Sequence, residues 1–134
     1  MQLTALKYGC AKVVNTSFDE TLENVRNALQ SEGFGVQAEI NISNALKEKL
    51  GVEVPRQMIL GACNPQLAFE ALQLEPEVSL LLPCNVTIQQ KPGAVEVAVI
   101  DAAKLMSFVG NPALEPLAAE AGRRLQRVLE KIQP

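Results

Sequence analysis

The chain has 134 residues, of which 48% are hydrophobic and 20% charged, and its net charge is -3 at pH 7. This length and composition are typical of one folded domain, and we expect a single domain over residues 1–134. The basic residues are scattered, Trp is absent and there is one Tyr. These features argue against a nucleic-acid partner, which needs a concentrated basic surface and aromatic stacking platforms.

Nothing in the sequence predicts secretion or a membrane partner. The first ten residues lack the basic start and long apolar run of a signal peptide. The apolar run Val78 to Pro83 is far too short to span a bilayer. Three widely spaced cysteines do not predict a disulfide framework. We therefore expect a soluble, cytoplasmic protein.

The N-terminal segment predicts a strand followed by a helix. Leu6 to Val14 is strand-like, and Ser17 and Glu20 stand three apart, as in a capping box at the start of a helix. Apolar residues recur at helical spacing after Ser17, and Gly33 provides the left-handed residue that ends the helix.

The next segment predicts a strand and a short helix. Residues 36–40 alternate apolar and polar side chains, which indicates a strand with one buried face. Asn41 or Ser43 can cap a brief amphipathic helix that stops at Gly51.

The segment Gln57–Cys63 is apolar on both alternating faces, so we expect it in the middle of the sheet or at a subunit contact. Asn64 as cap and Pro65 as first helical residue predict a helix that ends at Glu75.

The last third predicts a hairpin and two helices. Strands Cys84–Gln89 and Ala94–Ile100 flank a turn with Pro and Gly, and should pair antiparallel. Asp101 can cap a short helix to Val109, and a longer helix follows from Asn111. We therefore predict an α+β single domain, with a mixed or antiparallel sheet and helices mainly packed on one face.

The absence of histidine excludes Ser-His and Cys-His nucleophile pairs and His-containing metal sites. The segment Gly33 to Gly35 follows a helix and lacks the third glycine of a dinucleotide fingerprint. Three cysteines without a Cys-x-x-Cys pair do not predict zinc. We expect no cofactor, no metal and no catalytic residue, and hence no enzyme of these kinds.

Two Cys-Asn pairs are the candidate site. Cys63 and Asn64 precede a helix start, and Cys84 and Asn85 begin a strand. If the two strands are antiparallel neighbours, both pairs meet at one end of the sheet. The helix that starts at Pro65 has unpaired backbone N–H groups and a positive dipole end in its first turn. These favour a thiolate or a bound anion near Cys63.

The alternative interpretation is that both cysteines are small core residues, which is the commoner environment for a free thiol. Glu39 and Lys49 could add polar groups to a ligand site, although such residues more often form a solvated face.

Several segments together resemble the bacterial and archaeal domain-of-unknown-function 302 family. They are Glu39-Ile-Asn, Leu46-Lys-Glu-Lys-Leu-Gly51, Ile59-Leu-Gly-Ala-Cys-Asn-Pro65 and Leu82-Pro-Cys-Asn-Val86. The resemblance covers nearly the whole chain and implies a compact α+β domain that forms homodimers. It implies no biochemical role.

Three functions therefore stay open. The first is a non-enzymatic binding or regulatory module that holds a small molecule or an anion near the two Cys-Asn loops. The second is a thiol-redox or thiol-carrier protein in which Cys63 attacks and Cys84 resolves. The third is a structural or interaction domain whose function is dimerisation.

Overall fold

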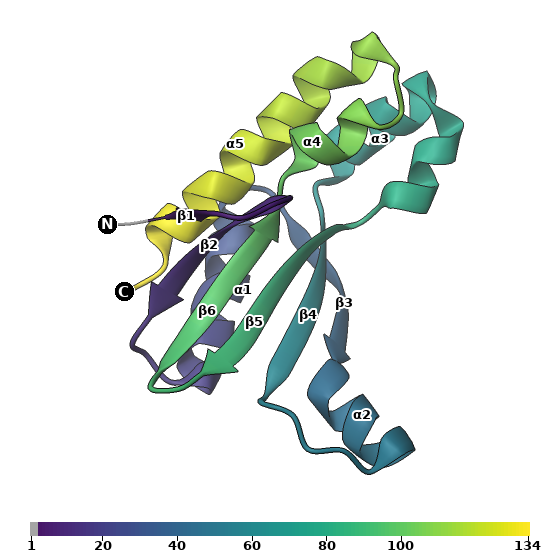
Figure 1. Cartoon of the computed structure of the whole chain (residues 1–134). Helices are drawn as coiled ribbons and strands as arrows, with labels where there is room; N and C mark the ends of the chain where they lie inside the picture. The colour runs from purple at the N-terminus through teal and green to yellow at the C-terminus, as the bar shows by residue number, and fades with distance from the viewer. Residues whose placement is uncertain (1–2) are drawn as a thin grey trace.

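The computed structural model describes residues 3–134, and these residues form one six-stranded sheet with helices packed against it (Figure 1). Its strands are β1 (Thr4–Ala5), β2 (Gly9–Val14), β3 (Gly35–Asn41), β4 (Gln57–Cys63), β5 (Cys84–Lys91) and β6 (Ala94–Ile100). Its helices are α1 (Phe18–Ser31), α2 (Ile42–Leu50), α3 (Pro65–Leu74), α4 (Ala102–Ser107) and α5 (Glu115–Lys131), with 3-10 turns η1 (Pro76–Leu81) and η2 (Pro112–Leu114).

The strands lie in the order β1-β2-β6-β5-β4-β3, and every neighbouring pair is antiparallel. The predicted α+β class is thereby confirmed, with the antiparallel rather than the mixed sheet. The predicted hairpin is β5-β6, which forms the centre of the sheet. Our placement of Gln57–Cys63 in the middle is wrong, because β4 lies one strand from the edge. Leu60 of β4 lies in the main core, and Ile59 lies on the opposite face of the sheet.

The main core lies between one face of the sheet and the helices α1 and α5 (Figure 1). The sequence specifies α1 locally: Ser17 Oγ accepts from the Glu20 backbone N–H at its start, and Gly33 adopts a φ of 84° just after its end. The buried side of each helix is the apolar stripe expected from the sequence. The stripes comprise Phe18, Leu22, Val25 and Leu29 in α1 and Leu125, Val128, Leu129 and Ile132 in α5 and just after it.

Polar contacts hold α1 and β2 against the C-terminal end of α5. Glu32, directly after α1, accepts a hydrogen bond from Arg127 Nε at 2.9 Å and pairs with Lys131. Lys12 of β2 is almost fully buried, and its Nζ donates to the backbone oxygen of Ile132 at 2.6 Å. A cation at this position faces the carbonyl groups left open at a helix C-terminus.

A smaller hydrophobic cluster lies beyond one end of the sheet and is called the cap here. It consists of α3, η1, α4, η2 and the first turns of α5, which lie together in Figure 1. Ala71, Val78 and Leu114 form its buried centre, separate from the main core. Asn64 caps α3, because its Oδ1 accepts from the Leu67 backbone N–H at 3.1 Å.

Two strand predictions need correction. Residues 6–8 form a turn between β1 and β2, closed by a hydrogen bond from the Leu6 N–H to the Gly9 oxygen, so the predicted strand starts only at Gly9. β3 lacks the predicted buried face: none of its residues is buried, and its register shifts between Val36 and Ala38. A bulge moves one side chain out of the alternation, and Val36 is the β3 residue that packs against the main core in the described part of the chain.

Within residues 3–134, no helix has both the length and the apolar character that a membrane span requires.

Candidate functional site

Cys63, Asn64 and Cys84 come together at the end of the sheet that faces the cap. β4 and β5 pair with Ala62 directly opposite Cys84, so Cys63 is one residue out of register with Cys84. On its other side Cys63 pairs with Gly35 of β3. Successive side chains of a strand point to opposite faces. The two thiols therefore reach this end of the sheet from different sides.

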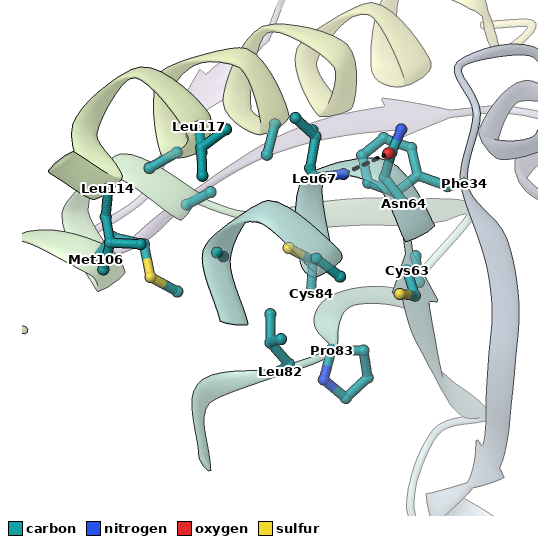
Figure 2. A pocket seen from close by; sticks show the side chains of 16 residues that line it. Phe34, Cys63, Asn64, Leu67, Leu82, Pro83, Cys84, Met106, Leu114 and Leu117 are labelled. Carbon is teal, nitrogen blue, oxygen red and sulfur yellow. Dashed lines mark hydrogen bonds between the residues drawn. The ribbon is translucent and has the colours of Figure 1, made fainter. Parts of the chain in front are cut away.

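These residues line a cavity of about 60 Å³ between the sheet and the cap (Figure 2). Phe34 and Ala62 form the side toward the main core. The opposite side comes from the cap and from α5, with Leu67, Ala71, Leu82, Met106, Leu114, Leu117, Ala118 and Ala121 among the lining residues. The cavity therefore lies at the boundary between the two hydrophobic clusters.

Among residues 3–134, the side chains that line the cavity are largely apolar, and none of them is charged. Its one amide side chain is that of Asn64, which is 7% exposed. The Oδ1 atom is engaged at the start of α3, and the Nδ2 atom lies beside Gly33. The amide group thus joins the start of α3 to the turn after α1.

The two thiols differ in their environments. Burial raises the pKa of Cys84 to about 11, and the nearby Cys63 adds to this rise. At neutral pH, Cys84 is therefore a protonated thiol that contributes an apolar, polarisable surface to the cavity. Cys10 is remote from this end of β5, on β2, and burial also raises its pKa.

The loop before Cys84 is fixed by a close contact with β4. A Cβ atom on Gly61 would lie 2.8 Å from Pro83 Cγ, which is closer than Cβ atoms approach other atoms. Only glycine at this position lets Pro83 lie against the strand. Gly61 thereby helps to set the position of Cys84 and of Leu82, both of which line the cavity.

Four of the seven site residues predicted from the sequence lie elsewhere. Pro65 is the exposed first residue of α3, and Lys49 is exposed in the last turn of α2. Asn85 points to the opposite face of the sheet from Cys84 and pairs with Gly61. Glu39 on β3 accepts hydrogen bonds from Arg26 at 2.7 and 2.8 Å, and these lower its pKa.

Sequence reasoning missed the wall formed by the cap and α5. The signal that could have indicated it is the recurrence of alanine within the apolar stripes of two helices. In α3 these residues are Ala68 and Ala71, and in α5 they are Ala118 and Ala121. Small side chains on facing helices leave room between them, but the sequence does not show which helices face each other.

Comparisons with known proteins agree with this architecture. The family model described as domain of unknown function DUF302 matches residues 10–132. A crystal structure of an uncharacterized conserved protein DUF302 from Bacillus stearothermophilus is 29% identical, with a TM-score of 0.89. The similarity covers 96% of this chain and 100% of that chain. No curated protein matches this chain.

Proposed function

Because the chain belongs to the DUF302 family, whose description assigns no role, we propose from the geometry of the cavity that it binds a small, neutral, largely apolar ligand. The observation that carries this proposal is that Cys63, Asn64 and Cys84 share one cavity wall at the junction of the main core and the cap. Ligand sites occur preferentially at such boundaries and are mostly apolar, with few polar groups.

The chemistry of the wall supports a neutral ligand over an anion. The lining residues include no Lys or Arg, and an anion moved from water into an uncharged apolar site loses hydration that nothing replaces. The amide of Asn64 provides one polar group, and the sulfur atom of Cys84 provides a polarisable contact. A short aliphatic or small aromatic molecule with at most one polar group fits this set.

The size of the cavity supports entry by movement of the cap. A dry cavity that binds benzene has a volume of about 150 Å³, whereas this one has about 60 Å³. It holds an atom or a very small molecule as it stands. A larger ligand needs the cap to shift away from the sheet, and the separate small cluster of the cap makes such a shift less costly than opening the main core.

The cysteines support ligand contact more than thiol chemistry. A resolving or attacking cysteine reacts as the thiolate, and the raised pKa of Cys84 keeps it protonated near neutral pH. The one-residue offset from Cys63 also turns the two side chains toward different faces of the sheet. A thiol-carrier function would therefore depend on Cys63 alone.

We further propose that the protein acts as a cytoplasmic homodimer. Three free cysteines suit a reducing compartment. β4 has apolar side chains on both faces, with Leu60 in the core and Ile59 on the side that no helix covers. An apolar outer face is expected where a second subunit packs.

Xenon binding followed by methyl NMR tests the cavity without knowledge of the natural ligand. Xenon occupies small dry cavities, and we expect it to shift the methyl resonances of Leu67, Met106 and Leu117. Ala121→Val fills the cavity and should abolish these shifts. Ala119→Val, on the same helix but outside the cavity, is the matched control and should retain them.

Native mass spectrometry of freshly purified protein complements this test. We expect a copurifying small molecule that Ala121→Val loses and Ala119→Val keeps. Absence of xenon shifts at the cavity, or equal shifts in both variants, would contradict the proposed site. A copurifying molecule retained equally by both variants would place the ligand elsewhere on the protein.

A further inference from the structure

The face of the sheet opposite α1 and α5 is covered by no helix in the part of the chain that the structure describes (Figure 1). The registers show which side chains lie on it. One row across the strands consists of Ile40, Ile59, Thr87, Ala98 and Ala11. No residue in this row is charged. All five side chains are either alanine or β-branched, so they rise only a short distance above the sheet.

Several large apolar side chains on this face are exposed. An antiparallel sheet with one face in water normally presents polar residues there. Here Val13 is 54% exposed and Ile40 is 48% exposed, at opposite sides of the same face. Ile59 lies between them on β4 and is partly exposed. Asn85, Gln89 and Glu96 lie on the same face, so exposed apolar and polar side chains are mixed on it, as they are in protein interfaces.

A hollow of about 520 Å³ lies over β5 and β6 on this face. Its floor includes the small side chains of Thr87 and Ala98, and its rim includes Lys7, Tyr8 and Glu96. Tyr8 is 67% exposed, in the turn between β1 and β2. The hollow is large enough for an aromatic side chain, and the same rim carries an exposed one.

The hollow is self-complementary in charge, which favours a second copy of the chain as its occupant. Of the residues that the structure describes, its rim has one cation, Lys7, and one anion, Glu96. In a twofold dimer, each surface meets its own copy, so Lys7 of one subunit can face Glu96 of the other twice. The face carries both signs of charge, so a partner with a strong net charge of either sign has little to recognise on it.

The area of the face is also on the scale of a stable dimer. Six strands about 4.8 Å apart, with a rise of about 3.3 Å per residue, give roughly 600 Å² of projected area. Because side chains project from the sheet, its accessible surface area is larger than this projected area. It approaches the ~800 Å² that each partner of a stable interface buries. Two sheets stacked face to face is a common packing arrangement.

We infer that two copies of the chain stack through this uncovered face, with Tyr8 of each inserted into the hollow of the other and Lys7 opposite Glu96. The inference rests on the proposed homodimer and names its interface. The ligand cavity lies on the opposite side of β5, since Cys84 faces the cavity and Asn85 faces the hollow. Both cavities of the dimer therefore stay accessible from the caps.

The interface is tested by sedimentation equilibrium of the wild-type chain and of a variant with a charge at the centre of the face. The wild-type chain should sediment at twice its 14.5 kDa monomer mass. Thr87→Arg places two like charges against each other across the twofold axis and should weaken the dimer at least about a hundredfold. The control, Gln126→Arg on the exposed side of α5, adds the same charge and should leave the dimer unchanged. Both variants should retain the wild-type circular dichroism spectrum.

Reversal of the proposed charge pair supplies an independent readout. Lys7→Glu and Glu96→Lys should each weaken the dimer, and the double variant should recover most of the loss. Because the chain has one Tyr and no Trp, its fluorescence reports Tyr8 alone. Acrylamide should quench Tyr8 several-fold less in the wild-type dimer than in Thr87→Arg.

The outcomes separate the interface from the homodimer. A wild-type monomer at micromolar concentration would overturn both. A wild-type dimer that withstands Thr87→Arg, with Tyr8 equally quenched in both proteins, would overturn this interface and leave the homodimer to another surface. Xenon binding at the cavity is unaffected by either result.

Discussion

The contact between Glu32 and α5 leads to a quantitative prediction for Glu32→Gln. The Glu32 side chain is 9% exposed, whereas its partners Arg127 and Lys131 are 45% and 44% exposed. Gln keeps the size of the side chain but removes the charge. One of its two terminal atoms is an NH2 group, which must then face a cation that the carboxylate formerly bound.

The magnitude lies between two limits. Hydrogen bonds to charged groups contribute about 1.5 to 3 kcal/mol, and exposed ion pairs contribute about 0 to 1 kcal/mol. A buried carboxylate with half-exposed partners should lie between these limits. We therefore expect Glu32→Gln to lower the free energy of unfolding by about 1 to 2 kcal/mol at pH 7.

The pH dependence identifies the charge as the cause. The hydrogen bond from Lys131, and then that from Arg127, lower the pKa of Glu32 in the folded state. Its contribution is therefore complete above the unfolded pKa of about 4.3 and is lost as the pH falls through the lower folded value. The difference between wild type and Glu32→Gln should therefore shrink as the pH falls below about 4.3.

Urea unfolding at a fixed protein concentration, followed by circular dichroism at pH 7 and pH 3, measures both effects. Glu23→Gln is the control, because Glu23 forms a more exposed pair with Arg26 one helical turn away. We expect it to cost less than about 0.5 kcal/mol. The reasoning would be refuted by equal losses in the two variants, or by a Glu32→Gln loss that stays the same at pH 3.

Three further predictions concern the site and its supports. Asn64→Ala removes the cap of α3 and should cost about 1 kcal/mol in thermal unfolding, whereas Asn64→Asp retains an acceptor, and equal losses would exclude the capping role. Gly33→Ala should destabilise the protein, because Gly33 has a φ of 84° and a Cβ there would lie 2.9 Å from Asn64 Nδ2. Gly122→Ala, in open space on α5, should instead stabilise it by about 0.5 to 1 kcal/mol. A change of the same sign in both variants would contradict this explanation. At pH 8 about one Cys84 thiol in a thousand is ionised, so peptide mapping after brief iodoacetamide treatment should find Cys63 modified first, and equal modification would argue against a buried Cys84.

The helix starts could be predicted from the sequence because their signals are local. Asn64 followed by Pro65, and Asp101 before α4, cap their helices as expected, since each side chain bonds an amide three residues along. The β5-β6 hairpin was equally accessible, with Gly93 at a φ of 71° in its turn. Each of these features depends on neighbouring residues alone.

Features that depend on distant segments could not be predicted. Leu6 and Tyr8 alternate as in a strand, but the chain turns there, and its Tyr8 carbonyl accepts from the Asp101 N–H in a distant segment. The exposed state of β3 likewise depends on which elements fail to cover it. The cavity combines Cys84 with Ala121, which come together only once α5 lies across the end of the sheet.

The strand order has a consequence for synthesis of the chain on the ribosome. β2 lies between β1 and β6, so one of its edges stays unpaired until residues 94–100 have emerged from the ribosome. The hydrogen bond from Lys12 to the Ile132 oxygen can form only later, when Ile132 has emerged. At about 5–20 residues per second, this interval lasts several seconds. A nascent β2 edge can pair with other chains during that time. Limited proteolysis of stalled nascent chains should show β2 protected only in chains long enough to expose β6, and slow decoding between the two strands should increase aggregation.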